Sequence, residues 1–479
     1  MIDNKKNNKL NRSQKKALNV LKSKNNIFLT GDPGVGKTYL INLFIDELKK
    51  SNCNVLVTAS TGIAALNLGG ITMHKAFSIP VPAYGHPVKT SSYTFLQYVD
   101  VVIIEEISLC RNDAFSYMCN CIKMAEKKFN KKIQLIIIGD FYQLPPVVKQ
   151  SEYNKMRTYG YDLSGYAFTS IEWKTMKFKI IALHEVIRQS DVEFINNLNK
   201  LKVSNKTCIK YFNKKVQSNK EFYPENAVCL CSTNVAANAI NKEKLDSIDS
   251  EQFIYLAEKT GNISTDIPND EVVVLKNGAK IIFLNNDNEH NNYYNGMLGT
   301  VKECKKDGAI IETEQGKLIK VEPYIWNIYT YKSRNGIIKK EIVGTFKQMP
   351  VRLAYAITIH KSQGKTFEKI ILNPKAFADG QLYVALSRLK SIDGLYLTEE
   401  INAEYLKTNK KVKDFYENYS YTVSEAQTKK QKDYNKKLNA PKKKSKERSK
   451  SNNKSKTKSK LHLSKSKPKV KKQKKTRKQ

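Results

Sequence analysis

Acidic residues are scarce in this sequence relative to basic ones. The 479 residues include 45 Asp plus Glu against 83 Lys plus Arg, which leaves a formal net charge of +38. The excess is uneven, because the segment from Lys429 to the end contains 24 basic and only 2 acidic residues. A charge of this size and sign indicates a polyanionic partner.

Long apolar runs are also missing. The longest stretches, such as VVII at 101–104 and LIIIG at 135–139, are far shorter than the ~20 residues that a membrane-spanning helix needs. They predict buried β-strands instead. The first residues, MIDNKKNNKL, lack the charged and then apolar pattern of a secretory leader.

The eight cysteines do not follow a zinc-finger spacing. Two pairs have the spacing C-x-C, with no companion His or Cys pair nearby: Cys119 with Cys121, and Cys229 with Cys231. This arrangement favours ordinary buried thiols over a metal site. In a chain without a leader it also indicates a reduced intracellular compartment.

The length suggests roughly two to four compact units. From Ile27 the sequence predicts an apolar strand, a glycine-rich turn and an amphipathic helix. Further β-branched runs (VLVTAS, VDVVIIEE and KIQLIIIGD) predict the buried parallel strands of a doubly wound α/β domain that ends near Trp173.

A second α/β pattern appears in KIIALHEV, NAVCLCST, KIILN and DGLYLT. It is interrupted by short strand-like segments separated by NG, DG and QG turns, which predict a small antiparallel barrel at 271–353. Beyond Ser424 the chain is mostly Lys, Ser, Asn and Gln, so it is expected to be disordered. This basic tail is compatible with a nuclear address, a viral replication site or a salt-sensitive nucleic-acid tether.

The segment GDPGVGKT carries the strongest motif. It fits G-x-x-x-x-G-K-[ST] between an apolar strand and a helix, which is the context of a phosphate-binding loop. Backbone N–H groups would surround the phosphates, Lys37 would reach the β and γ oxygens, and the Thr38 hydroxyl would ligate Mg²⁺. The residues expected to cradle the nucleotide before Lys37 and Thr38 are Gly31, Asp32, Pro33, Gly34, Val35 and Gly36.

Two further strand ends carry polar residues of the kind that such a loop needs. Glu105 and Glu106 follow VVII, where the first would hold Mg²⁺ and the second would take a proton from the attacking water. Gln143, in GDFYQLPPV, follows the next apolar strand and is a candidate sensor of the γ-phosphate. Paired acids at a strand end are common, so this interpretation depends on the phosphate-binding loop upstream.

The order of these motifs resembles the petite-integration-frequency (Pif) helicases of superfamily one. The resemblance covers about residues 8–400 and rests on VTASTGIAALNLGGITMHKAF, EEIS, GDFYQLPPV, EVIRQ, AITIHKSQGKT and QLYVALSR. It implies an α/β fold of two RecA-like P-loop lobes, with the inserted barrel as an SH3-like subdomain. It also implies ATP between the lobes, single-stranded DNA across them and movement from 5′ to 3′.

The resemblance assigns additional nucleotide-site residues. Gln14 matches the adenine-reading glutamine, Arg188 and Arg388 match two arginines that face the γ-phosphate, and Gly364 and Gln381 match positions near the nucleotide. On bare sequence, a lone arginine or glutamine is ordinarily a surface residue. The family usually carries Asp where this chain has Glu105, so the metal-binding carboxylate is one methylene longer.

For DNA, the resemblance points to two segments. TMHKAF is expected to form a loop, and TIHKSQ lies in the second lobe; both are in family positions that meet the strand. Cations and aromatic rings suit phosphate neutralisation and base stacking, whereas ordinary loop polarity is the plain alternative. The DNA-binding candidates are His74, Lys75, Phe77, Thr358, His360 and Lys361.

The predicted protein is therefore an ATP- and Mg²⁺-dependent DNA helicase acting on single-stranded and forked DNA, monomeric or weakly self-associating. A P-loop kinase or GTPase would not need the later motifs, and a RecD-like or RNA-directed translocase of the same superfamily remains the alternative. Replication, recombination, repair and telomere maintenance all fit. The predicted domains are 1–175 and 176–270 with 354–405 as the two lobes, 271–353 as the insertion, 406–424 as a C-terminal helix and 425–479 as the tail.

Overall fold

The computed structural model describes residues 10–418, except for 186–188, 190, 218, 262, 264–266, 288–289, 335–336 and 376–377. Arg188 and the predicted disordered tail, 425–479, lie outside the described residues. The chain divides between Asp433 and Tyr434, and the fold below is that of the described residues before this division.

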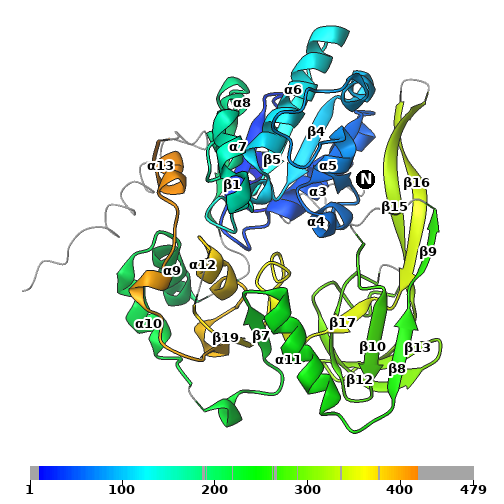
Figure 1. Ribbon diagram of the computed structural model, residues 1–479, viewed down its shortest axis with the longest axis vertical. Coiled ribbons are helices and arrows are strands. Elements are labelled where there is room, and N and C mark those ends of the chain that lie inside the picture. Colours follow the sequence, from blue (N-terminus) through cyan, green and yellow to red (C-terminus); the bar gives the residue numbers. More distant parts are fainter. Residues whose placement is uncertain are drawn as a thin grey trace, which may run out of the picture. The chain divides into compact units, whose positions relative to one another are not determined.

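A six-stranded parallel sheet forms the first part of the fold, in the order β3-β2-β4-β5-β1-β6 (Figure 1). Each strand is a short apolar run, as expected for strands buried on both faces. The strands are β1 (Ile27–Gly31), β2 (Val55–Ala59), β3 (Ile71–Thr72), β4 (Val101–Glu105), β5 (Gln134–Ile138) and β6 (Lys179–Leu183). The helices around them are α2 (Arg12–Leu21), α3 (Lys37–Lys50), α4 (Gly62–Asn67), α5 (Met73–Phe77), α6 (Asn112–Phe129), α7 (Tyr153–Thr158) and α8 (Ile171–Thr175).

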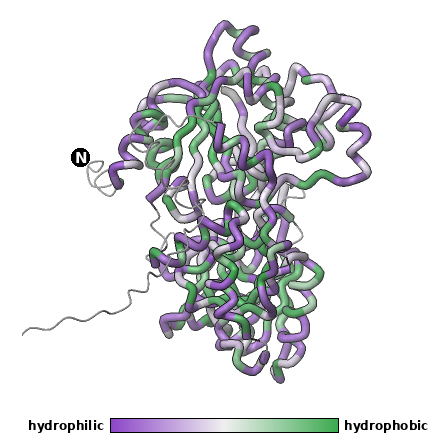
Figure 2. The backbone as a smooth tube through the Cα atoms, turned by 90° about the vertical axis from the view of Figure 1, so that its left-hand side faces the viewer, coloured by the Kyte–Doolittle hydropathy of each residue, from purple (hydrophilic) through white to green (hydrophobic). Residues whose placement is uncertain are grey.

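Side chains that alternate along these strands build two separate cores, one on each face of the sheet. Phe28 belongs to one core, whereas its neighbours Ile27 and Leu29 belong to the other. Successive residues of a strand point to opposite faces, so one apolar strand supplies both cores. Hydrophobic stretches accordingly gather in the interior in Figure 2, and hydrophilic stretches lie outside.

A four-stranded parallel sheet, in the order β18-β7-β19-β20, forms the second α/β part. Its strands are β7 (Val228–Cys231), β18 (Ala356–Thr358), β19 (Ile370–Leu372) and β20 (Leu395–Leu397). Its helices are α9 (Val192–Lys202), α10 (Ile209–Asn213), α11 (Asn234–Asp246) and α12 (Gln381–Leu386). The fold is thus mixed α/β with parallel-sheet cores, as predicted.

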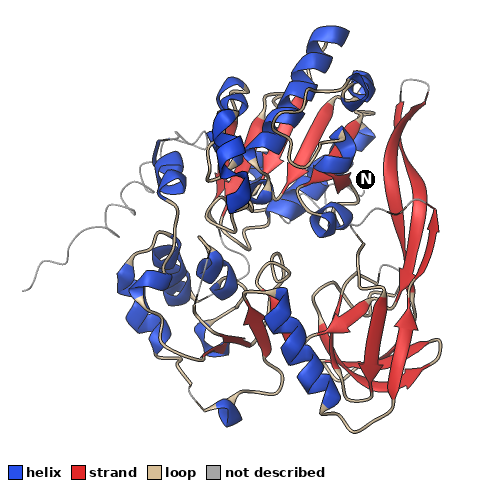
Figure 3. Ribbon diagram, in the orientation of Figure 1, coloured by secondary structure: helices blue, strands red, loops and turns tan. Residues whose placement is uncertain are grey.

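The chain leaves the second sheet after α11 and returns to it at β18. Between them, the described strands pair antiparallel and enclose a core of their own, and Figure 3 shows strands and loops here rather than helices. The strands are β8 (Gln252–Leu256), β9 (Glu258–Gly261), β10 (Val272–Lys276), β11 (Lys280–Phe283), β12 (Leu298–Lys305), β13 (Gly308–Thr313), β14 (Leu318–Val321), β15 (Tyr324–Arg334), β16 (Ile337–Gln348) and β17 (Val351–Leu353).

The long β15–β16 hairpin reaches the first α/β part. Lys340 Nζ donates a 2.5 Å hydrogen bond to the Gly69 carbonyl, just after α4, and lies 3.5 Å from the centre of the Tyr329 ring. Tyr331 packs against the core of the first sheet. The hairpin therefore makes specific contacts outside the insertion.

Short 3₁₀ turns and one final helix complete the described elements. The 3₁₀ turns are η1 (Thr90–Ser92), η2 (Thr94–Tyr98), η3 (Ile107–Leu109), η4 (Gln150–Glu152), η5 (Ala167–Thr169), η6 (Lys206–Cys208), η7 (Lys220–Phe222), η8 (Ile392–Gly394) and η9 (Ala403–Tyr405). The last helix is α13 (Lys410–Asn418). Among the described residues, no helix is long and apolar enough to cross a membrane.

Three strands fall outside the domain that the sequence predicted for them. The run KIIAL, predicted with the second α/β unit, forms β6 and pairs with β1 at the edge of the first sheet. β8 and β9 precede the predicted start of the insertion at 271, but they pair antiparallel with its strands β10 and β16. An apolar strand carries no local mark of the sheet that it will join, because its neighbours are distant in sequence.

Candidate nucleotide and nucleic-acid sites

The segment GDPGVGKT forms the turn between β1 and α3. Gly31, Gly34 and Gly36 all have positive φ, and a Cβ on Gly31 would lie 2.3 Å from the Leu183 carbonyl oxygen. Only glycine fits that approach. Lys37, the first residue of α3, donates hydrogen bonds from Nζ to the carbonyls of Gly31 (2.7 Å) and Asp32 (3.1 Å).

Thr38 and Glu105 bring two oxygen ligands together at the carboxyl edge of the sheet. The Thr38 hydroxyl donates a 2.5 Å hydrogen bond to Glu105 Oε1, and Glu105 is only 7% exposed. Burial and the neighbouring Glu106 raise the pKa of Glu105 to about 7, although Thr38 and Lys37 act in the opposite direction. Although the Glu105 side chain is one methylene longer than Asp, it still reaches Thr38, the other predicted magnesium ligand.

Glu106 adopts a left-handed backbone conformation, with φ of 56°, immediately after β4. Gln363, from the second α/β part, donates from Nε2 to Glu106 Oε2 at 2.8 Å and to Gln143 Oε1 at 3.3 Å. Burial raises the pKa of Glu106, and the positive charges of Lys37 and Arg388 oppose the shift. The predicted base and the predicted sensor therefore meet through one amide.

Arg388 is 1% exposed and lies just after α12. Its guanidinium donates to the Val384 carbonyl at 2.8 Å and to the Ser387 hydroxyl at 2.7 Å. A Cβ added to Gly380, which begins the same helix, would lie 2.7 Å from the Gln143 carbonyl oxygen. The turn before α12 thus packs directly against the Gln143 loop.

A partly buried ion pair joins the phosphate-binding turn to the second α/β part. Lys202, the last residue of α9, forms a short ion pair with Asp32, and the Tyr383 hydroxyl donates to Asp32 at 3.4 Å. Burial raises the pKa of Asp32, but Lys202 outweighs this and lowers it overall. Asp32 and Pro33 also line a small pocket with Leu198 and Tyr383.

The remaining predicted nucleotide residues lie in different environments. Gln14 is 1% exposed and donates from Nε2 to the Val35 carbonyl at 3.1 Å, so it contacts the phosphate-binding turn. Gln381 is fully buried at the start of α12. Gly364 is exposed and has φ of +79°, with no atom within 4 Å of an added Cβ.

The segment TMHKAF forms the short helix α5 rather than a loop. His74 and Lys75 are half-buried on it, while Phe77 is fully buried in the core and packs against Phe95 at 6.0 Å. The Phe77 ring therefore supports the helix and offers no face to a base in this structure. The spacing of Phe77 and Lys75 in the sequence does not reveal that Phe77 is buried, because its burial depends on segments distant in the sequence.

The second predicted DNA segment follows β18. Thr358, its last residue, is 4% exposed and accepts a hydrogen bond from the Lys361 backbone N–H at 3.3 Å. His360 is exposed, and Lys361 is half-buried. Thr358 thus shapes the turn that carries both basic side chains.

Lys361 belongs to a basic cluster that also contains Lys365 and Arg352. Burial, Arg352 and Lys361 lower the pKa of Lys365 to about 8, while burial and Arg352 lower the pKa of Lys361. Asp270 forms a 3.2 Å ion pair with Arg352 and offsets part of this charge. Half-buried cations that outnumber the neighbouring acids are expected where an anion binds.

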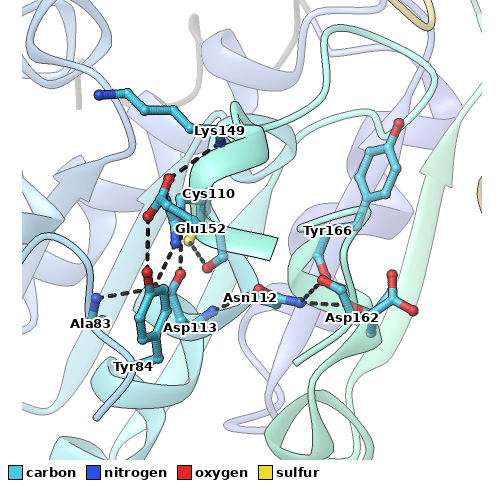
Figure 4. Close-up of polar contacts among 11 residues, drawn as sticks. Ala83, Tyr84, Cys110, Asn112, Asp113, Lys149, Glu152, Asp162 and Tyr166 are labelled. Carbon is cyan, nitrogen blue, oxygen red and sulfur yellow. Dashed lines mark hydrogen bonds and ion pairs between the residues drawn. The ribbon is translucent and has the colours of Figure 1, made fainter. Parts of the chain in front are cut away.

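A polar network fixes the segment that follows α5 (Figure 4). Arg111 donates to Asp113 at 2.9 Å and to Glu152 at 3.0 Å. Asp113 Oδ2 accepts from the Ala83 N–H at 3.0 Å, and the Tyr84 hydroxyl donates to Glu152 at 3.3 Å. The network ties this segment to the start of α6 and to η4.

Several of these contacts were not predicted from the sequence. Gln363 lies inside the quoted motif AITIHKSQGKT, so the motif itself could have pointed to it. Asp140 lies in GDFYQ in the same way, and its Oδ2 is buried without a hydrogen-bond partner among the described residues. Lys202 stands in no recognisable motif, and only its position in space connects it with Asp32.

Taken together, the phosphate-binding turn on a parallel sheet, the paired acids and the buried arginine from a second parallel sheet define a P-loop nucleotide-dependent enzyme with two α/β parts. The sequence model of the family described as PIF1-like helicase matches residues 9–218. The chain is 31% identical to the ATP-dependent DNA helicase Pif1 of Campylobacter jejuni, over 84% of this chain and 96% of that protein.

Solved structures agree. Pif1 of Bacteroides sp. in complex with ADP-AlF4 has a TM-score of 0.76 and 31% identity, over 86% of this chain and 97% of that chain. Bacteroides Pif1 bound to single-stranded DNA has a TM-score of 0.61 and 31% identity, over the same shares. The chain belongs to the Pif1-like helicase family, as the motifs predicted.

Proposed function

We propose that this chain is an ATP-hydrolysing DNA helicase that moves 5′ to 3′ on single-stranded DNA and separates duplexes. The observation that carries the proposal is the junction of Glu106, Gln143 and Gln363, where the two α/β parts meet beside the phosphate-binding turn. Contacts that span such a junction allow nucleotide state to change how the two parts engage a strand. The related helicase from Campylobacter jejuni and the two Bacteroides complexes support the same activity.

The proposed nucleotide roles follow the geometry. Lys37 and the N–H groups of the turn bind the phosphates, Gln14 reads the base, and Arg388 with Arg188 stabilises the charge that develops on the transferred phosphate. Glu106 accepts a proton from the attacking water, and Gln143 senses the γ-phosphate. Gly364 and Gln381 lie on the second α/β part as further nucleotide contacts.

Thr38 and Glu105 fit a magnesium ion. Both supply oxygen atoms, they lie within hydrogen-bonding distance of each other, and the hard Mg²⁺ ion prefers oxygen ligands. When bound, the ion would neutralise charge on the phosphate oxygens. The two residues orient those oxygens toward Lys37 at the start of α3.

The DNA path is proposed to run over His74 and Lys75 on α5 and over the turn containing Thr358, His360 and Lys361. Lys365 and Arg352 extend the second segment as phosphate contacts, because their charges are concentrated and partly buried. Phe77 would act by supporting α5. Single-stranded and forked DNA are the proposed partners, and the basic tail would add contacts that weaken as salt rises.

We further propose the domain division of the sequence analysis, with two RecA-like lobes and an SH3-like insertion, amended by assigning β6 to the first lobe and β8 and β9 to the insertion. This amendment rests on the strand pairing. A monomer or weak self-association, a role in replication, recombination, repair or telomere maintenance, and a nuclear or viral replication site belong to the same proposal.

The test is ATPase and strand separation by the purified chain on duplexes with a 5′ or a 3′ single-stranded overhang, with RNA-tailed duplexes alongside. Unwinding of only the 5′-tailed DNA is expected, and Lys37→Ala should abolish it. Lys49→Ala, at the exposed far end of the same helix, is the matched control and should behave as the unaltered chain. Absence of stimulation by any nucleic acid would overturn the proposal.

A further inference from the structure

Helix α13 packs on the first sheet although it follows the second in sequence. Phe415 inserts among aromatic side chains of the first core, with ring centres 4.5 Å from Phe168, 5.4 Å from Phe141 and 5.7 Å from Trp173. A buried aromatic cluster of this kind holds a helix in one orientation. The helix thereby presents its next residue, Tyr416, to the carboxyl edge of the sheet.

The Tyr416 hydroxyl lies between two strand ends of the nucleotide site. It is 2.9 Å from Thr30 Oγ1, accepts from the Phe141 N–H at 3.1 Å, and donates to Asp140 Oδ1 at 3.5 Å. One phenolic oxygen can accept two hydrogen bonds and donate one, so Thr30 is the donor of the remaining contact. The hydroxyl is then fully used.

These partners are adjacent to groups that face the phosphates. Thr30 is 2% exposed and precedes Gly31, whose carbonyl holds Lys37 Nζ. The carboxylate of Asp140 interacts electrostatically with Lys37. A displacement of Tyr416 would therefore be felt at the strand end that starts the phosphate-binding turn and at the charge beside its lysine.

The aromatic ring of Tyr416 makes a second connection. It stacks on Tyr142 with ring centres 4.8 Å apart and an interplanar angle of 10°. The Lys202 Nζ lies 4.9 Å from the centre of the Tyr142 ring and pairs with Asp32. The stack thus borders the ion pair that joins the two α/β parts.

We propose that α13 is an integral part of the ATP site and that Tyr416 is a positioning residue, which fixes the ends of β1 and β5 through its hydroxyl. This inference deepens the proposed ATP hydrolysis and rests on it. Tyr416 does not touch the reacting atoms; it acts through Thr30 and Asp140 on the placement of Lys37.

The test replaces the hydroxyl alone, with Tyr416→Phe in the full-length chain. Tyr416→Phe removes all three hydrogen bonds of the hydroxyl. Affinity for a fluorescent ATP analogue and the KM for ATP at saturating single-stranded DNA are both expected to worsen about fivefold, which is the size of effect that one hydrogen bond ordinarily contributes. The KM for DNA should not change. A change confined to nucleotide parameters distinguishes positioning from general loosening.

Tyr255→Phe is the matched control. Its side chain is buried, and its single hydroxyl proton lies within hydrogen-bonding distance of two carbonyl oxygens inside the insertion, those of Lys305 (2.9 Å) and Gly308 (2.8 Å). It should lower thermal stability as Tyr416→Phe does while leaving nucleotide affinity unchanged. Equal nucleotide parameters in the two variants would overturn the inference.

The binding measurement keeps the two proposals separable. If the unaltered chain hydrolyses no ATP, the proposed function fails, yet analogue binding still reports whether Tyr416 positions the site. If hydrolysis is normal and Tyr416→Phe binds the analogue as tightly as the unaltered chain, the positioning role alone is wrong.

Discussion

The strand ends of the two parallel sheets carry opposite charges. At the first sheet, Glu105 and Asp140 are buried and Glu106 is half-buried, and removal from water raises the pKa of each carboxyl group. In the second sheet, Lys361 and Lys365 follow the end of β18 and are half-buried, and burial lowers the pKa of both ammonium groups. Acids outnumber the nearby cations Lys37 and Arg388 at the first edge, and cations outnumber the single acid Asp270 at the second.

Such arrangements cost stability in the free protein and are relieved by a ligand of the other sign. A cation would relieve the acidic edge, and phosphate groups would relieve the basic one. The difference explains how one fold can assign nucleotide chemistry and strand binding to neighbouring sheet edges. Four experiments test this difference by altering the acidic edge, the basic residues or the ion pair between the two parts.

Replacing the acid that is proposed to activate water should have the largest effect. Glu106→Gln is expected to lower kcat for ATP hydrolysis by about 10²- to 10⁴-fold, because an amide cannot accept the proton. Binding of an ATP analogue and of single-stranded DNA should remain. Steady-state ATPase and equilibrium binding measure the two sides separately.

Asp46→Asn, on the exposed face of α3, is the control for that change and should hydrolyse ATP normally. If kcat of Glu106→Gln lies within twofold of the value for the unaltered chain, Glu106 is not the general base of ATP hydrolysis.

The Asp32–Lys202 pair is the direct link between an acid of the first part and a cation of the second. Asp32→Asn and Lys202→Met are each expected to lower the free energy of unfolding by roughly 2 kcal/mol, since each leaves a partly buried charge unpaired. The double variant should lose less than the sum. Urea unfolding of the four proteins gives the coupling energy.

An additive cycle would mean that the two charges do not interact, so that this ion pair does not contribute to joining the first and second parts.

Deleting the residues after Ser424 tests how much of the DNA affinity comes from basic residues of the tail rather than of the folded part. Binding to single-stranded DNA at low salt is expected to weaken about tenfold, and its salt dependence should become shallower, because fewer counterions are released. ATPase per bound enzyme should remain near normal. Fluorescence titrations at several salt concentrations measure this, and a large loss of turnover at saturating DNA would contradict it.

The smallest effect is expected from Lys365→Met, which removes one disfavoured charge. Binding to single-stranded DNA should fall by about threefold, whereas stability at pH 7 should rise by about 1 kcal/mol after allowance for solvent screening. The pKa of Lys365 is about 8 in the folded chain, below the ordinary lysine pKa of the unfolded chain. The folded chain therefore loses this proton first as pH rises, so the stability of the unaltered chain should approach that of the variant between about pH 8 and the ordinary lysine pKa.

Lys306→Met, at an exposed turn between β12 and β13, serves as the control. If Lys365→Met and the unaltered chain are equally stable at both pH 7 and pH 10, the Lys365 charge does not destabilise the folded chain.

Local patterns predicted the nucleotide side well. The strand, turn and helix around GDPGVGKT appear as β1 and α3, joined by the predicted turn. Their signals lie within one short segment, because backbone geometry and apolar periodicity are local properties. The DNA side was less readable, as Phe77 illustrates: an aromatic beside a lysine suggested a stacking surface, but long-range packing buries it.

The sequence by itself determined the phosphate-binding turn, the excess of positive charge and the family to which the chain belongs, since each is written in contiguous residues or in composition. Tertiary structure alone decided which sheet β6 joins and which side chains meet across the site. Gln363 reaches Glu106 over 257 residues, Lys202 reaches Asp32 over 170, and Tyr416 reaches Thr30 over 386. Contacts at these separations arise only when distant segments pack together, because no local periodicity or motif encodes the partner.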